Sequence, residues 1–237
     1  MNVNVKMKRQ VVIYLIAALT LSACTVKSKT KADDDIVRIK GIDVSHYQGD
    51  IDWTQVNKSK VEFVFIKATQ GEHTVDSRFK ANWNDSKPNL LRGVYHYLDP
   101  SIDATKQAQH FLAITQLDFG DFPPVVDIEA FEKQSSKDVV KSLKDYIGVI
   151  YAASTCTPII YSSPGFLNSL KDEDFGKHIL WLADYNPKPK VPNGWKAWTF
   201  WQFESNGKIQ GIQKDVDISY FAHDRAALEA MACQTTQ

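Results

Sequence analysis

A short apolar strand that ends in two carboxylates is the first feature of this chain that could perform chemistry. It spans residues 123–129 and reads Pro-Pro-Val-Val-Asp-Ile-Glu. Because side chains alternate faces along a strand, Asp127 and Glu129 point the same way, while Val126 and Ile128 point the other way. Mutual repulsion and partial burial would raise the proton affinity of one carboxyl, which could then serve as a general acid. A half-exposed edge strand with solvated acids is the alternative.

The chain around this segment alternates between predicted strands and helices. We expect strands at 39–45, 62–69, 91–98, 123–129, 158–162, 179–185, 199–203 and 216–221. We expect helical segments at 52–56, 77–85, 104–114, 136–154 and 164–170, and a C-terminal helix at 223–233. The connections after residue 179 are too short, and too rich in Pro, Gly and Asn, for full crossover helices.

Eight strands, the first five separated by helical segments, predict an α/β fold. We expect one domain, a modified TIM-like parallel barrel whose last third lacks helices. Such barrels carry their active sites at the carboxyl ends of the strands. Asp43 lies near the end of the first strand and Asp217 on the eighth, and these strands are neighbours in a closed barrel. We therefore expect Asp43, Asp127, Glu129 and Asp217 to converge on one pocket.

Aromatic residues are numerous on the same strands. They are Tyr95, Tyr97, Tyr161, Trp181, Tyr185, Trp198, Trp201 and Phe203. Most are expected in the core, because large rings dominate buried area. Those at strand ends could stack on the apolar faces of sugar rings. An acid-lined pocket with flanking aromatic rings suits a carbohydrate substrate.

The first residues form an export signal rather than part of the domain. Lys6, Lys8 and Arg9 precede a short apolar run at 11–21, and Leu-Ser-Ala-Cys follows at 21–24. The run is too short for a stable membrane span, and its end matches a bacterial lipobox, in which lipid is attached to Cys24. A plain signal peptide is the alternative. We expect a signal peptide at 1–23, a lipidated cysteine with a polar tether at 24–38 and a catalytic barrel with a C-terminal helix at 39–237.

This arrangement predicts an exported lipoprotein, anchored in the cell envelope through Cys24. Thr25, which is not an aspartate, is compatible with the outer membrane if the host has two membranes. The 237-residue chain is 43% hydrophobic and 24% charged, which allows one domain of about 200 residues with a sizeable core.

Charge and cysteine usage narrow the classes of function. Loss of the signal removes three basic residues and no acidic one, and leaves 25 basic against 28 acidic residues. The sequence has no basic patch of the kind that binds nucleic acid. The six histidines include no HExxH pair or similar ligand spacing, so we expect no metal or other cofactor. Cys156 and Cys233 could form a disulfide in an oxidising compartment, but the sequence does not show that they meet.

Longer motifs resemble one known family. They are Gly41-Ile-Asp-Val-Ser-His-Tyr-Gln-Gly49 with Ile51-Asp-Trp53, Phe63-Val-Phe-Ile-Lys-Ala-Thr69, Gly93-Val-Tyr-His-Tyr97, Pro124-Val-Val-Asp-Ile-Glu129, Trp181-Leu-Ala183, Trp201-Gln-Phe203 and Val216-Asp-Ile218. In this order, from about residue 39 to 221, they are similar to glycoside hydrolase family 25, the lysozymes first described from moulds, streptomycetes and bacteriophages.

The resemblance implies an N-acetylmuramidase on a (β/α)5(β)3 barrel. Such an enzyme cleaves the β-1,4 bond between N-acetylmuramic acid and N-acetylglucosamine in peptidoglycan. Glu129 falls on the family's general acid, Asp127 on its partner acid, and Asp43 and Asp217 on two further pocket aspartates. The residues expected to bind substrate are Tyr95, Tyr161, Tyr185, Trp201 and Gln202.

Two positions depart from the family pattern, and several alternatives stay open. Gln70 stands where the family often has Glu, and Ile-Ser-Tyr-Phe follows Asp217 where an Asn is common. Asp127 could orient the substrate acetamido group as an internal nucleophile, or Asp43 or Asp217 could activate water for inversion. A catalytically silent peptidoglycan-binding module and a hydrolase of another acetamido-sugar polymer, such as chitin, are the competing functions. We expect a monomer whose partners are glycan strands and a membrane.

Overall fold

The computed structural model describes residues 38–86, 90–115, 121–129, 133–171 and 174–233. The predicted signal peptide, Cys24 and residues 24–37 of the tether lie outside the described residues. In the described part, no helix is both long and apolar enough to cross a membrane.

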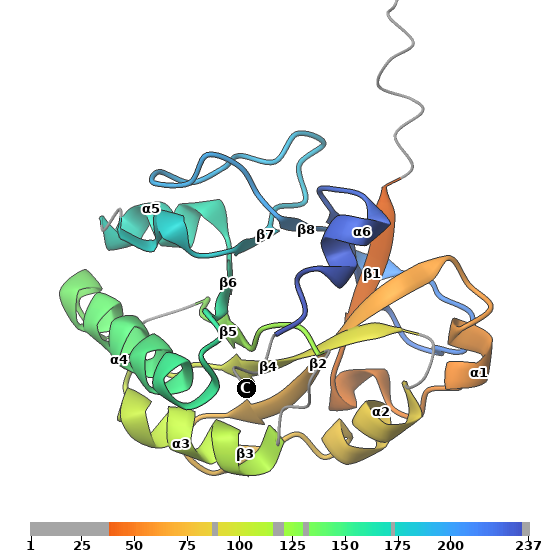
Figure 1. The fold of residues 1–237 in the computed structure, drawn as a ribbon, viewed down its shortest axis with the longest axis horizontal. Helices are drawn as coiled ribbons and strands as arrows, with labels where there is room; N and C mark the ends of the chain where they lie inside the picture. Colours follow the sequence, from red (N-terminus) through yellow and green to blue (C-terminus); the bar gives the residue numbers. More distant parts are fainter. Residues whose placement is uncertain (1–37, 87–89, 116–120, 130–132, 172–173, 234–237) are drawn as a thin grey trace, which may run out of the picture. The chain divides into compact units, whose positions relative to one another are not determined.

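Eight strands close into a barrel (Figure 1). They are β1 Ile39–Val44, β2 Val61–Gln70, β4 Leu91–Tyr97, β5 Val125–Asp127, β6 Ile159–Ser162, β7 Leu180–Ala183, β8 Phe200–Gly207 and β9 Val216–Phe221. Pairing runs around the sheet from β1 through β9, β8, β7, β6, β5 and β4 to β2, and β2 pairs again with β1. A short strand that was not expected, β3 Thr74–Val75, adds to β2. The predicted (β/α)5(β)3 barrel is confirmed.

The last strand runs against its neighbours, so the prediction of a wholly parallel barrel is wrong at this point. β9 is antiparallel to both β8 and β1, whereas β1, β2 and β4 to β8 pair in parallel. The reason is the short connection at 208–215, which can form a hairpin but not a crossover. Asp217 therefore lies at the start of β9, and it pairs in register with Asp43 near the end of β1.

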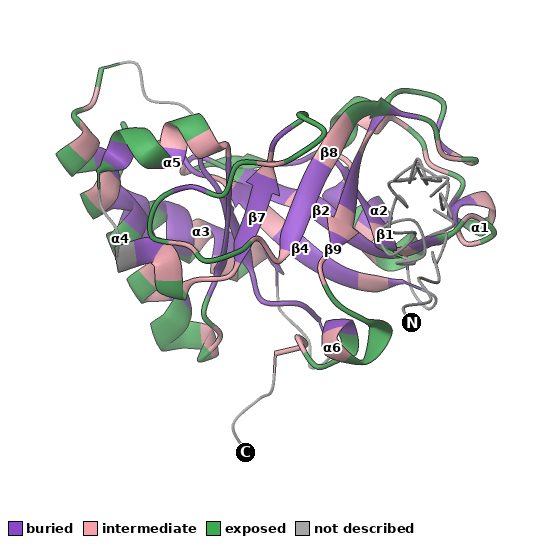
Figure 2. Cartoon of the chain, turned by 90° about the horizontal axis from the view of Figure 1, so that it is seen from above, coloured by how far each residue is buried: buried purple, intermediate pink, exposed green. Residues whose placement is uncertain are grey.

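The helices surround the barrel and follow the predicted positions closely. They are α1 Trp53–Val56, α2 Phe79–Asp85, α3 Ala104–Thr115, α4 Ser136–Ser154, α5 Pro164–Leu170 and α6 Arg225–Glu229, with short 3₁₀ helices η1 His46–Gln48 and η2 Asp174–Lys177. In α4, Val139, Leu143, Tyr146 and Ile150 are buried at helical spacing. Figure 2 shows buried strands in the middle of the fold and exposed outer faces on α4 and α5. The C-terminal helix is shorter than the expected 223–233.

Large aromatic side chains fill the barrel interior. Phe65 stacks on Trp181 at 4.4 Å between ring centroids and meets Phe200 edge-on at 5.2 Å. Glycine makes room for these rings on two strands, because a Cβ atom at Gly41 would lie 2.1 Å from the ring of Phe63 and one at Gly93 would lie 2.8 Å from that of Phe65. The rings form a packed floor below the carboxyl ends of the strands.

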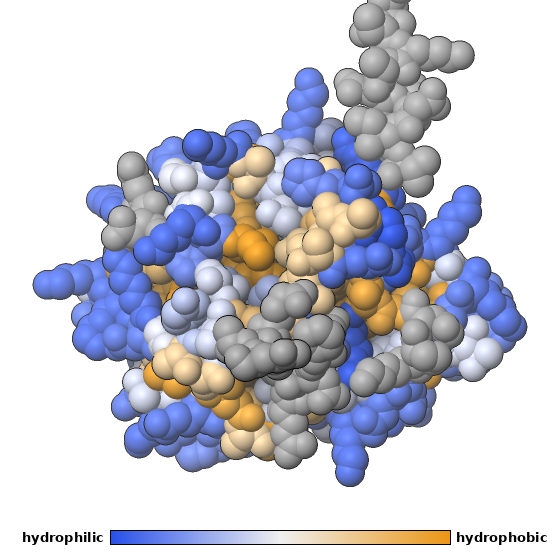
Figure 3. All heavy atoms as spheres, in the orientation of Figure 1, coloured by the Kyte–Doolittle hydropathy of each residue, from blue (hydrophilic) through white to orange (hydrophobic). Residues whose placement is uncertain are grey.

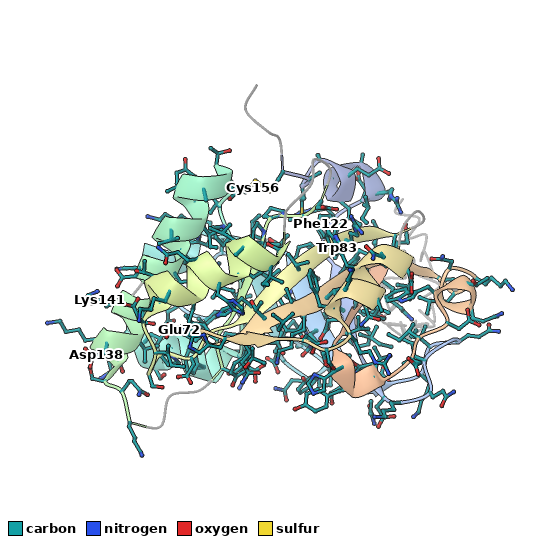
Figure 4. All side chains as sticks on the ribbon, turned by 90° about the horizontal axis from the view of Figure 1, so that it is seen from below. Glu72, Trp83, Phe122, Asp138, Lys141 and Cys156 are labelled. Carbon is teal, nitrogen blue, oxygen red and sulfur yellow. A yellow bond between two sulfur atoms is a disulfide. The ribbon has the colours of Figure 1, made fainter. Side chains whose placement is uncertain are left out.

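The other end of the barrel is closed by the C-terminal segment. Leu228 of α6 is fully buried against the aromatic cluster, and the backbone N–H of Cys233 donates to the carbonyl of Asp121. Cys233 forms a disulfide with Cys156, which follows α4 (Figure 4), with Cα atoms 6.0 Å apart. The pairing that the sequence left open is therefore present. On the face shown in Figure 3, hydrophilic side chains predominate and apolar ones occupy small areas between them.

Candidate active site

Asp127 is the last residue of β5, and Glu129 follows just beyond the strand. The expected strand at 123–129 is thus shorter, but the next residues remain in place because the Ile128 N–H donates to Tyr161 O and the Ser162 hydroxyl donates to Ile128 O. Asp127 is buried, while Glu129 is exposed. The two acids therefore occupy an inner and an outer position at the end of one strand.

The environment of Asp127 favours its protonated form. Burial is the largest cause of a pKa well above the usual aspartate value, and the neighbouring Glu129 charge and a hydrogen bond to Glu129 raise the pKa further. Lys67 opposes this with its positive charge. The Oδ1 atom of Asp127 is buried and has no hydrogen-bond partner among the described residues. Such an unsatisfied oxygen in an interior position is a feature of functional sites.

Asp43 and Asp217 form a second acidic pair across the β1–β9 seam. The pKa of Asp43 is raised well above the usual value, first by burial and then by the charge of Asp217. Burial raises the pKa of Asp217 to about 6, although its hydrogen bond with Asp43 acts in the opposite direction. This is the proximity that barrel closure predicts for the two aspartates.

Gln202 on β8 holds Asp43 in position. Its amide nitrogen donates to Asp43 Oδ2 at 2.9 Å, and its Oε1 atom accepts hydrogen bonds from the hydroxyls of Tyr161 at 2.9 Å and Tyr185 at 2.8 Å. These three bonds determine which way the amide faces. The Asp43 carboxyl is thereby tied to two tyrosines that rise toward the open end of the barrel.

All four acids line one pocket with a volume of about 380 Å³. The residues around it are Asp43, Val44, Ser45, Tyr47, Gln48, Lys67, Gln70, Tyr95, Tyr97, Asp127, Glu129, Tyr161, Trp181 and Asp217. The structure thus brings together the four carboxylates that strand parity and barrel closure single out. Tyr95 and Tyr161 lie in the same wall, and Tyr185 reaches the site through Gln202.

Besides Tyr185, two further residues expected to bind substrate do not line the pocket. Gln202 is buried and supports Asp43 without lining the pocket. Trp201 also lies outside the pocket, because adjacent residues on β8 face opposite sides and it therefore points away from the barrel interior. Its indole N–H donates to Asp184 O, and its ring packs beside Trp198 and Tyr220. The substrate contact expected of Trp201 stays a prediction.

Pocket residues that the sequence did not single out come mainly from β2 and the turn after β1. Lys67 shares its face of β2 with Phe63 and Phe65, so the alternation along the strand could have identified it. Tyr47 in η1 is 66% exposed and stacks on His46 with ring centroids 4.2 Å apart. Asp76 holds this turn by accepting hydrogen bonds from both the backbone N–H and the ring of His46.

Comparison with known proteins assigns the chain to a family. Residues 42–212 match the model of glycosyl hydrolases family 25. The chain belongs to this family. It is accordingly a glycoside hydrolase of the muramidase class, and the pocket described above is its candidate active site.

Relatives of this family 25 member share both its sequence and its fold. The chain is 39% identical to the uncharacterised protein YegX of Escherichia coli K12, over 77% of this chain and 69% of that one. It is 32% identical to Lysozyme M1 of Streptomyces globisporus, over 87% and 76% of the two chains. The crystal structure of the Streptomyces coelicolor lysozyme matches with a TM-score of 0.80 and 31% identity, over 85% of this chain and all of that one.

Within the described residues, no group of three or more His, Cys, Asp and Glu side chains is arranged to hold a metal ion. The carboxyl groups of this family 25 site can act in two ways: one acid can transfer a proton, and its neighbours can stabilise positive charge.

We predict that Asp217→Asn stabilises the fold at neutral pH. Folded protein keeps a proton on Asp217 up to a pH of about 6, whereas the unfolded chain releases it near its ordinary pKa of 3.8. The free energy of unfolding therefore falls as the pH rises from 3.8 to about 6. With allowance for partial exposure, the variant gains about 1 kcal/mol at pH 7, or roughly 2–4 °C in Tm, and little at pH 3.5.

Thermal unfolding of the two proteins across this pH range measures the effect. Asp215→Asn is the matched control, because Asp215 is exposed and pairs with Lys208 outside the pocket. An equal gain in Tm in both variants, or a gain at pH 3.5 as large as that at pH 7, would contradict the raised pKa of Asp217.

Proposed function

We propose that this protein hydrolyses peptidoglycan by cleaving the β-1,4 bond between N-acetylmuramic acid and N-acetylglucosamine. The observation that carries the proposal is the convergence of four carboxylates, from β1, from the end of β5 and from β9, on one pocket of a family 25 chain. An acid-lined pocket of this kind can protonate a leaving sugar oxygen and stabilise the oxocarbenium-like cation that remains.

Glu129 is our candidate proton donor. It is the outer member of the pair at the end of β5 and is exposed, so its carboxyl can reach the oxygen of a glycan lying across the pocket. Asp127 lies deeper, where burial and the neighbouring Glu129 charge raise its pKa well above the usual aspartate value, while the charge of Lys67 favours its ionised form. In the proposal Glu129 carries the proton and Asp127 acts as its acceptor partner in the pocket.

The position of Asp127 beside Glu129 favours assistance by the substrate. Two acids at the end of one strand are poorly placed to flank opposite faces of a sugar ring. In our proposal the Asp127 oxygen without a partner accepts a hydrogen bond from the acetamido N–H of muramic acid. Glu129 protonates the glycosidic oxygen, the bond from C1 to that oxygen breaks, and the acetamido oxygen bonds to C1.

Water completes the reaction from the side that the leaving sugar has vacated. It adds to C1 as the bond from C1 to the acetamido oxygen breaks, and it gives a proton to the Glu129 carboxylate, so the product first carries the β configuration. Inversion through water activated by Asp43 or Asp217 is the competing mechanism. Against it stands the environment of Asp43, which is buried and bonded to Gln202, and whose pKa is raised.

Three tyrosines are proposed to contact the glycan. Tyr95 and Tyr161 line the pocket, and Tyr185 is exposed and hydrogen-bonded to Gln202. The hydroxyls of Tyr161 and Tyr185 both donate to Gln202, which leaves their rings oriented for contact with sugar faces.

We further propose that the enzyme is an exported lipoprotein anchored through Cys24. The support is the order of a basic start, a short apolar run and Leu21-Ser22-Ala23-Cys24 in the sequence. In this arrangement residues 24–38 connect the catalytic domain to the membrane, where it faces wall glycan.

We predict that Glu129→Gln reduces the rate of release of reducing ends from purified peptidoglycan by roughly a hundredfold or more, because the amide cannot donate the proton. Glu62→Gln is the control, since Glu62 lies near the start of β2 and pairs with Arg225 of α6. It should retain wild-type activity. If the folded parent binds walls of several compositions but releases nothing, the protein is a binding module and the proposed hydrolysis is wrong.

We predict that Cys24→Ser moves the protein from the membrane fraction to the soluble exported fraction, because serine cannot accept the thioether-linked lipid. Fractionation of cells that express each form, with detection of the barrel, measures this. Cys233→Ser is the matched control and should stay with the membrane. Equal partitioning of Cys24→Ser and the parent would contradict lipid anchoring.

A further inference from the structure

Lys67 is the one basic side chain among the described residues that line the pocket, where it faces four carboxylates. It lies near the end of β2 on the same face as Phe65, directly above the aromatic floor of the barrel. The pairing of β2 with β4 shifts register between Lys67 and Thr69, and this irregularity brings Gln70 into the pocket wall as well. Lys67 and Gln70 are thus neighbours at the mouth.

Among the described residues, the ammonium group of Lys67 hydrogen-bonds to an amide and not to a carboxylate. Its Nζ atom donates to Gln70 Oε1 at 2.8 Å and lies 5.1 Å from the centroid of the Tyr97 ring. No carboxylate of the described residues forms an ion pair with it. Since an ammonium carries three N–H donors, two remain for another acceptor.

Gln70 places a second hydrogen-bond donor beside the Lys67 ammonium group. Because its Oε1 atom accepts from Lys67, its NH₂ group is the part of the amide left to bind something else, and no described residue takes it. Gln70 is exposed, so a ligand can reach this group. A positive charge and an amide N–H₂ side by side match the two oxygens of a carboxylate.

We propose that Lys67 and Gln70 form a subsite that binds a carboxylate on the muramyl side of the substrate. This inference rests on the proposed muramidase function. Muramic acid differs from glucosamine by a lactyl ether, whose acid group is a free carboxylate on peptide-free strands and an amide where a stem peptide is attached. Stem peptides carry carboxylates of their own. Either source presents an anion to a subsite that is otherwise surrounded by acids.

A purely electrostatic role for Lys67 makes a different prediction. Lys67 lowers the pKa of Asp127, and loss of that effect would change the rate on every substrate by a similar factor. Carboxylate binding instead changes the ratio of rates between a charged substrate and its neutral counterpart. The ratio therefore separates the two roles.

The test compares kcat/KM on matched glycan oligomers. One sample is peptide-free with lactyl carboxylates, a second is the same material converted to neutral methylamides, and a third carries stem peptides. We expect wild-type enzyme to prefer the carboxylate form over the methylamide by roughly tenfold to a hundredfold, the range of a charge-assisted hydrogen bond. Efficient cleavage of the third sample that falls when its peptide carboxyls are amidated would identify the stem peptide as the source of the anion.

Three variants test which side chains bind the carboxylate. Lys67→Met should reduce the preference to about one, and Lys67→Arg should retain most of it. Gln70→Glu should also abolish the preference, because the new carboxylate pairs with Lys67. Since residue 70 is exposed, this variant can replace Lys67→Met if Lys67→Met does not fold. Two results would overturn the subsite: equal wild-type rates on the charged and neutral forms of both the lactyl and the stem-peptide samples, or an unchanged preference in Lys67→Met.

Binding to Glu129→Gln separates this inference from the proposed function. If the carboxylate oligomer binds this variant more tightly than the methylamide, and Lys67→Met in the same background removes the difference, the subsite is supported even where the parent cleaves neither. If the parent cleaves all three samples at rates that do not depend on their lactyl or peptide carboxylates, and the charged and neutral forms bind equally, hydrolysis is supported and the subsite is wrong.

Discussion

Burial of carboxyl groups at the mouth of a closed barrel is the interaction on which the site depends. A charged carboxyl is costly to remove from water, and here the pKa values of Asp43, Asp127 and Asp217 are all raised as a result. The hydrogen bonds from Gln202 to Asp43 and from two tyrosines to Gln202 offset part of that cost. The raised pKa values mean that these buried carboxyls hold a proton at a higher pH than an exposed carboxyl does.

Contacts elsewhere in the barrel offset the cost of burying these carboxyl groups, because the two ends of the barrel are built differently. Below the acids, rings such as Phe65 and Trp181 fill the interior, and Gly41 and Gly93 leave the space that the rings need. The far end is covered by α6, and the disulfide to Cys156 ties the C-terminal segment to the end of α4. Stabilising contacts are thus concentrated at the end of the barrel away from the pocket, and unfavourable burial of carboxyl groups occurs at the pocket.

Sequence patterns predict the framework of this site well and its details unevenly. The 3.6-residue periodicity of 136–154 matches α4, and strand parity with barrel closure brings Asp43, Asp127, Glu129 and Asp217 together. The direction of β9 was not predicted, because the strand expected at 199–203 left about 12 residues for the connection. In the structure β8 extends to Gly207, and the remaining residues 208–215 are too few for a crossover. The position of Trp201 outside the pocket was not foreseen, because Trp-Gln-Phe has no clear alternation of polar and apolar residues. Lys67 was missed because one lysine in an apolar strand resembles a solvated position.

The most direct test of the account is proton NMR of the first product released from purified glycan strands, recorded before mutarotation. It reports both which sugar carries the new reducing end and the configuration of its anomeric carbon. Side-by-side action of Asp127 and Glu129 on a muramyl residue predicts a new N-acetylmuramic acid end in the β form. A new N-acetylglucosamine end, or a muramyl end that appears first as the α-anomer, would contradict it.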